Sequence, residues 1–99
     1  MAKKVLISVS DKKNILEMAS FLKERNYEIY STGGTYREIK KNNISINLIE
    51  DYTQSKEIMN GRVKTIHPKI FSGILADKKN QSHLNDLKDI NGFAFDIII

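Results

Sequence analysis

Short apolar runs alternate along the chain with longer segments in which apolar residues recur every three or four positions. Residues 5–9 are apolar at every position except Ser8, which is typical of a strand covered on both faces. Ser10-Asp11-Lys12 follows as a helix-start signal. The next segment has the spacing of one face of an amphipathic helix, closing near Arg25-Asn26, with an apolar stripe on Ile15, Met18, Ala19 and Leu22.

The same alternation continues through the rest of the chain. Residues 27–30 are predicted as a second strand, followed by a helix that carries Tyr36 and Ile39 inward and ends around residues 41–43. A third strand is expected over residues 44–49. After a segment without periodicity, Pro68 is expected to open a helix, residues 78–91 favour another, and residues 93–99 have the pattern of a buried strand. The apolar positions of the last two helices are Ile70, Phe71, Ile74 and Leu75, and Leu84, Leu87 and Ile90.

Strands that alternate with helices through short connections predict an α/β fold, an open and mostly parallel sheet flanked by helices. In such sheets ligands bind beyond the carboxyl ends of the strands. The connections expected at those ends are residues 8–12, residues 31–35, and the segment from Asp51 onward. We therefore expect these three connections to lie along the same edge of the sheet.

The segment Ser31-Thr32-Gly33-Gly34-Thr35 is rich in hydroxyl groups and glycine. Glycines let an anion approach the backbone amides, and a helix N-terminus adds unpaired N–H donors and a positive dipole end. The alternative is an ordinary tight turn with Thr35 as the helix cap. Neither the dinucleotide-binding fingerprint nor the P-loop pattern is present.

Ser8, Ser10 and Lys12 form a second polar cluster in the neighbouring connection. Ser10 has an alternative role as a helix N-cap. Lys12 lies at a predicted helix start, where the positive end of the helix dipole disfavours a cation and favours an anion. A phosphate bound next to Lys12 would remove this unfavourable interaction.

The segment Gly61-Arg62-Val63-Lys64-Thr65-Ile66-His67-Pro68 carries two cations, a hydroxyl and an imidazole without apolar periodicity. An extended backbone would send Arg62 and Lys64 to the same side. A solvated basic loop is the alternative. Three connections with the same anion preference predict a site for a phosphorylated small molecule, in which Lys64 could stabilise an oxyanion or donate a proton.

Composition limits the other classes of function. The 99 residues allow one domain, and a net charge of +4 is spread over interleaved acids and bases, which signals a nucleic-acid surface only weakly. The chain contains no cysteine, no membrane-length apolar stretch and no signal-peptide pattern, and it permits a reducing cytosol. His67 is expected to bond a backbone carbonyl and His83 to be solvated, so no metal site is predicted.

The motifs resemble the N-terminal part of a bifunctional purine-biosynthesis family, AICAR transformylase/IMP cyclohydrolase. The matching segments are residues 7–12, 31–35, 51–53, 61–69 and 73–75, in the family's order and across essentially the whole chain. The family's usual proline before glutamate is absent from Ser55-Lys56-Glu57, and Phe71-Ser72 stands where many members have His-Gly. The resemblance implies a methylglyoxal-synthase-like domain, truncated at its C-terminal end, with residues 1–99 as its N-terminal portion.

The resemblance also implies the reaction, the dehydrative ring closure of formyl-AICAR to IMP without cofactor or metal. In this comparison Lys64 is catalytic, Arg62 and Thr65 face the base, and the 5′-phosphate is held by Ser10, Lys12, Thr32, Gly33, Gly34 and Thr35. A separate transformylase domain would use 10-formyltetrahydrofolate. A cytoplasmic homodimer without nucleic-acid or membrane partners is expected. Because the family's catalytic tyrosine would follow Ile99, the 99-residue piece is expected to be inactive alone.

Three other functions remain open at this stage. A non-catalytic nucleotide-sensing domain of the same fold would explain the phosphate loops but not Arg62-Val63-Lys64-Thr65. A methylglyoxal synthase would need a catalytic aspartate that has no match in residues 61–65. A nucleic-acid-binding domain would show strongly salt-dependent binding to duplexes.

Overall fold

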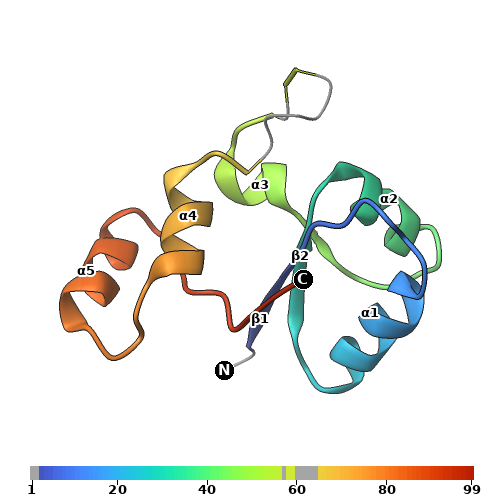
Figure 1. Ribbon diagram of the computed structural model, residues 1–99, viewed down its shortest axis with the longest axis horizontal. Helices are drawn as coiled ribbons and strands as arrows, with labels where there is room; N and C mark the ends of the chain where they lie inside the picture. The colour runs from blue at the N-terminus through green and yellow to red at the C-terminus, as the bar shows by residue number, and fades with distance from the viewer. Residues whose placement is uncertain (1–2, 57, 60–64) are drawn as a thin grey trace.

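Four parallel strands form one sheet in the part of the chain that the structure describes, residues 3–56, 58–59 and 65–99 of a computed structural model (Figure 1). The strand order is β3-β2-β1-β4. In the register Val5 faces Ile29 on one side and Ile97 on the other, and Tyr30 faces Asn47. The strands are β1 (Lys4–Ile7), β2 (Glu28–Ser31), β3 (Asn47–Leu48) and β4 (Ile97–Ile98).

Helices cover both faces of this sheet. Helices α1 (Ile15–Glu24) and α2 (Gly33–Lys40) lie on one side of β1 and β2, and α4 (Pro68–Leu75) and α5 (Gln81–Asp89) lie on the other (Figure 1). The short helix α3 (Ile49–Thr53) follows β3 directly. The predicted open parallel sheet flanked by helices is confirmed.

Strand β1 separates two hydrophobic cores. Successive side chains of a strand point to opposite faces, so Val5 and Ile7 pack towards α1 and α2, and Leu6 packs towards the other side. The first core also contains Ile15, Ala19, Leu22, Ile29, Ile39 and Ile46. The second core contains Ile49, Ile70 and Phe95. Both faces of β1 are therefore buried, as its continuous apolar sequence predicts.

Several predicted boundaries were wrong. The third strand is only Asn47–Leu48, because Ile49 already begins α3 and turns its side chain into the second core. The last strand is Ile97–Ile98, while Phe93 and Phe95 enter the second core from irregular backbone.

Some residues predicted to face the core are exposed instead. Met18 of α1 is 41% exposed, and the apolar residues Phe71, Ile74 and Leu75 of α4 are also exposed.

An aromatic cluster joins α3 to the chain that leads into β4. The Tyr52 ring stacks on Phe93 with centroids 4.4 Å apart, and the Tyr52 hydroxyl accepts a hydrogen bond from the Phe93 amide at 3.1 Å. Tyr30 contacts both rings. Burial raises the pKa of Tyr30 and Tyr52 because it disfavours the charged phenolate. Lys69 donates from Nζ to the Tyr52 carbonyl at 3.3 Å and thereby ties α4 to α3.

Asp96 fixes the entry into β4. Its carboxylate accepts hydrogen bonds from the Lys4 amide at 2.7 Å and from Lys78 Nζ. Burial alone would raise the pKa of Asp96, but the hydrogen bonds from Lys78 and from the Lys4 amide and the charges of Lys78 and Lys3 outweigh it, so this pKa lies below its ordinary value of 3.8. The charged carboxylate is therefore the form that the fold prefers.

Asp96→Asn should lower the free energy of unfolding at pH 7 by about 1 kcal/mol, since it removes charge-assisted hydrogen bonds from a partly exposed site. A carboxylate with a depressed folded-state pKa stabilises the fold above its unfolded pKa and loses that contribution as pH falls through the folded pKa. The difference between wild type and variant should therefore shrink below pH 3.8. Denaturant unfolding at pH 7 and pH 3 measures this, and Asp89→Asn is the control. A difference independent of pH would contradict it.

Gly73 allows α4 to approach the segment before β4. A Cβ atom at this position would lie 2.8 Å from the Phe93 carbonyl oxygen and 2.8 Å from a ring carbon of Phe95. Gly73→Ala should therefore destabilise the fold by about 1–3 kcal/mol through overpacking. Helix propensity alone would give the opposite sign, since alanine is favoured over glycine by about 1 kcal/mol in a helix. Denaturant unfolding decides the sign, with Ser72→Ala as the control for the same helix.

Candidate functional site

The strand order reverses at one point along the carboxyl edge of the sheet. The chain runs outward from β1 through β2 to β3, and then crosses to β4 on the opposite side of β1. In open α/β sheets the ligand crevice lies where the order reverses, beyond the carboxyl ends of the strands. Here that point is the end of β1, where the Ser8 amide donates to the Ile99 carbonyl at 2.8 Å.

The loops that follow β1 and β2 contact each other at this edge, as the sequence predicts. Thr32 Oγ1 donates to Ser8 Oγ at 3.4 Å, and Thr35 Oγ1 donates to the Val9 carbonyl at 3.4 Å. Thr32, Gly33 and Thr35 are buried, and Gly34 is half-buried. The two hydroxyl-rich segments are therefore in direct contact.

The glycine-rich segment is the first turn of a helix. Helix α2 begins at Gly33, and Thr32 is its N-cap residue without a side-chain capping hydrogen bond. The prediction that Thr35 could be the cap was wrong, because Thr35 lies inside the first turn and bonds to the neighbouring loop. The first amides of a helix have no partner within the helix. Those of α2 can therefore bind an anion, with the positive end of the helix dipole behind them.

Lys12 reaches over this helix start from the β1–α1 loop. A Cβ atom on Gly34 would lie 3.6 Å from Lys12 Cε and 3.7 Å from Lys12 Nζ. The ammonium donates to the carbonyls of Val9 and, at 3.4 Å, Ser10. The predicted N-cap role of Ser10 was wrong, because α1 begins only at Ile15 after Asn14, and Ser10 is exposed. Ser10 is thus left free to face a ligand.

The third connection is described only in part. Arg62 and Lys64 lie outside the described residues. Thr65 is half-buried, and its carbonyl accepts from the His67 amide at 2.9 Å. His67 caps α4 by accepting from the Lys69 amide through Nδ1 at 3.1 Å, a role that was not predicted for it.

Two polar residues beside the helix start, Ser31 and Arg37, are not among the predicted phosphate-binding residues, although Ser31 begins the hydroxyl-rich segment. Ser31 is fully buried at the end of β2, and its Oγ has no hydrogen-bond partner among the described residues. Arg37 extends back over the first turn of α2, where Nη2 would lie 4.0 Å from a Cβ on Gly34. The spacing of three residues between Gly34 and Arg37 places both on one helix face, and that spacing was the available signal.

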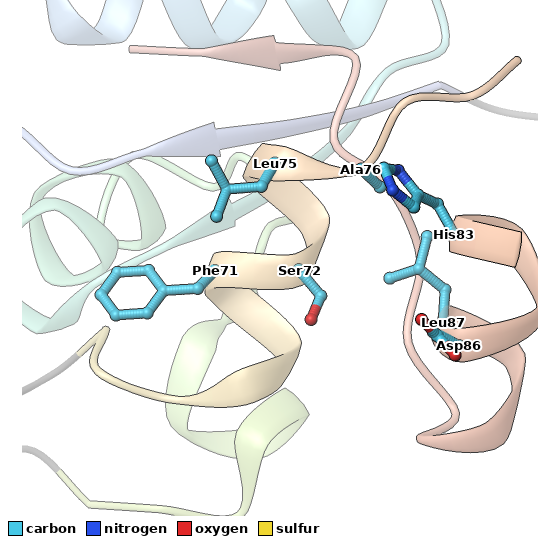
Figure 2. Close-up of a pocket in the computed structure, with 7 residues that line it drawn as sticks. All are labelled: Phe71, Ser72, Leu75, Ala76, His83, Asp86 and Leu87. Atoms are coloured by element: carbon cyan, nitrogen blue, oxygen red, sulfur yellow. The ribbon is translucent and has the colours of Figure 1, made fainter. Parts of the chain in front are cut away.

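A different cavity lies between α4 and α5, on the other side of the sheet from α2. Figure 2 shows its lining, and its volume is about 220 Å³. His83 accepts through Nδ1 from the Asp77 amide at 3.0 Å and is half-buried, so it is less solvated than predicted. The lining is mainly apolar and consists of Phe71, Ser72, Leu75, Ala76, His83, Asp86 and Leu87. This chemistry does not fit a phosphate.

The described residues offer neither a metal-ligand cluster nor a membrane-spanning helix. Residues 3–56, 58–59 and 65–99 contain no group of three histidine, aspartate or glutamate side chains that could hold a metal ion. None of the helices in that part of the chain is long and apolar enough to cross a membrane.

The parallel sheet and the two joined loops define an α/β domain that carries hydroxyl groups, a helix N-terminus and a lysine at one edge. The profile of the MGS-like domain family matches residues 14–99, and the chain belongs to this family. A solved structure titled "Crystal structure of ForH" superimposes with a TM-score of 0.87 at 28% identity, covering 99% of this chain and 51% of that one.

The curated relatives give a narrower comparison than the domain family does, because they share one protein name. The chain is 50% identical over 99 residues to the bifunctional purine biosynthesis protein PurH of Thermoanaerobacter sp. (strain X514), covering 100% of this chain and 20% of the relative. It is 44% identical over 97 residues to PurH of Staphylococcus aureus (strain Newman), covering 98% of this chain and 20% of the relative. The chain thus spans about a fifth of the length of the curated relatives it matches, at their N-terminal end. The predicted resemblance to this purine-biosynthesis family is confirmed.

Gly34→Ala should separate ligand binding from folding. The added methyl group would make only ordinary contacts, 3.6–4.0 Å from the mobile ends of Lys12 and Arg37. Alanine is a better helix former than glycine, so the free energy of unfolding should be unchanged or higher by up to about 1 kcal/mol. The methyl group would occupy space over the helix amides and should weaken binding of inorganic phosphate about tenfold or more. Calorimetric titration and denaturant unfolding measure the two effects, and unchanged affinity would contradict the placement of the site.

Proposed function

We propose that the chain forms the phosphate-binding part of an IMP cyclohydrolase domain, which closes the purine ring of formyl-AICAR to give IMP. The observation that carries the proposal is that the family's sequence segments lie in the two loops that could bind a phosphate. Segments typical of the purine-biosynthesis family occupy both loops at the carboxyl edge, and these loops offer hydroxyls, helix amides and a cation to one anion. The identity of 50% to PurH over the whole chain supports the same assignment.

The site suits the 5′-phosphate of the substrate. Thr32, Gly33, Gly34 and Thr35 supply the α2 amides and hydroxyl groups, and Ser10 and Lys12 approach from the neighbouring loop. The Lys12 ammonium now rests on backbone carbonyls and can turn towards a phosphate oxygen by side-chain rotation. Charge-assisted hydrogen bonds of this kind are about twice as strong as neutral ones.

Ring closure needs charge stabilisation more than a cofactor. The carboxamide nitrogen attacks the formyl carbon, and the formyl oxygen takes the developing negative charge. Proton transfer from nitrogen to oxygen gives a carbinolamine, and the hydroxyl then leaves as water with the proton of the former formamide nitrogen, so that a C=N bond to that nitrogen forms as the C–O bond breaks. By resemblance to the purine-biosynthesis family we assign Lys64 to stabilise the oxyanion, with Arg62 and Thr65 beside the base. A transformylase activity in the full-length protein, with 10-formyltetrahydrofolate as its co-substrate, belongs to the same proposal.

The proposal extends to the setting in which the protein works. The substrate is a small nucleotide, no nucleic-acid or membrane partner is needed, and the working form is a cytoplasmic homodimer. The alternative is a non-catalytic domain that senses a nucleotide. A sensing domain would use the same phosphate site, but it would bind the nucleotide without catalysing ring closure.

Lys64→Ala should lower kcat for ring closure about 100-fold or more in the full-length gene product, because loss of one oxyanion donor commonly has an effect of this size. Affinity for IMP should change much less, since the phosphate loops remain. Lys88→Ala on α5 removes the same charge far from the loops and is the matched control. Absorbance of the closed purine ring follows turnover. Wild-type protein that binds IMP but gives no turnover would favour the sensing alternative.

A further inference from the structure

Two cationic side chains converge over the start of α2. A Cβ atom on Gly34 would lie 3.7 Å from Lys12 Nζ and 4.0 Å from Arg37 Nη2. Lys12 belongs to the β1–α1 loop and Arg37 to α2 itself, so two separate elements direct positive charge to one point. That point lies next to the helix amides of the phosphate-binding segment.

The geometry of the helix explains how Arg37 reaches this point. Residues three apart share a helix face, and long side chains lean back towards the helix N-terminus. The Cα of Arg37 belongs to the last turn of the eight-residue helix, where a cation is favourable. Its guanidinium instead lies over the first turn, close to the positive end of the dipole.

This arrangement is electrostatically unfavourable without an anion. The ion pairs among the described residues join Lys4 to Glu28, Arg25 to Glu24, Lys41 to Glu38 and Lys78 to Asp96. Neither Lys12 nor Arg37 pairs with an acidic side chain in that part of the chain. Two like charges beside a positive helix end repel one another, and an anion between them would turn this repulsion into attraction.

We propose that Arg37 is a further phosphate-binding residue, which with Lys12 selects a phosphate monoester dianion. The proposal rests on the proposed function for the identity of the nucleotide. A guanidinium presents a planar fork of donors that can bind two phosphate oxygens together. Lys12 and Arg37 supply two positive charges, which match a terminal phosphate at neutral pH. A ligand without the phosphate gains nothing from Arg37.

The test compares Arg37→Met, Arg37→Lys and the control Lys40→Met in the full-length protein. Lys40 is exposed on the same helix, so its variant makes the same change in net charge. Arg37→Met should weaken IMP binding about tenfold by calorimetry, and Arg37→Lys should recover part of the loss. Affinity for inosine, which lacks the phosphate, should not change. In turnover assays KM should rise while kcat stays near the wild-type value.

Failure of this proposal is distinguishable from failure of the proposed function. Thermal stabilisation by inorganic phosphate requires neither turnover nor purine recognition, and it should be smaller in Arg37→Met than in Lys40→Met. Wild-type protein without ring closure would reject the cyclohydrolase assignment, and the phosphate measurement would still test Arg37. Equal effects of Arg37→Met and Lys40→Met on IMP affinity, or an equal loss for inosine, would overturn the role of Arg37. Should Arg37→Met fold poorly, Arg37→Gln provides the same comparison.

Discussion

The burial of β1 on both faces is the constraint on which the rest of the structure depends. Val5 and Ile7 enter one core and Leu6 enters the other, while the backbone pairs in parallel with β2 and with β4. A parallel strand with apolar side chains on both faces needs helices on both faces of the sheet to bury them. The same pairing brings the ends of β1 and β2 to one edge, so packing of apolar side chains fixes the position of the polar loops.

Those loops are stabilised less completely than the strands that carry them. The α2 N-terminus has no side-chain cap, Ser31 Oγ is buried without a partner among the described residues, and Lys12 bonds only to backbone carbonyls there. Each of these features is unfavourable in a region that serves stability alone. Their concentration at the switch point of the sheet is typical of a functional site, where local consistency is given up for ligand binding.

The sequence predicted the layers of the fold better than their boundaries. Periodicity over ten residues identified α1, and the apolar run identified β1, because both patterns are long enough to be distinctive. Helix α3 has only five residues, too few for a helical period, so Ile49 was assigned to a strand. The cluster at residues 8–12 and 31–35 was predictable from topology. Arg37 was not, because its role depends on a side-chain direction and on the approach of Lys12.

Fold and chemistry are encoded in different parts of this chain. The proposed phosphate site would use helix amides, hydroxyl groups and cations at a sheet edge, and such a site can serve many phosphorylated ligands on the same scaffold. Similarity at the level of ForH, 28% identity with a TM-score of 0.87, therefore describes mainly the scaffold. The distinction between a sensor and a cyclohydrolase depends instead on the segment from Gly61 to Pro68. The apolar pattern of the sequence requires none of the segment's cations or hydroxyl groups for packing, which agrees with the proposed catalytic role.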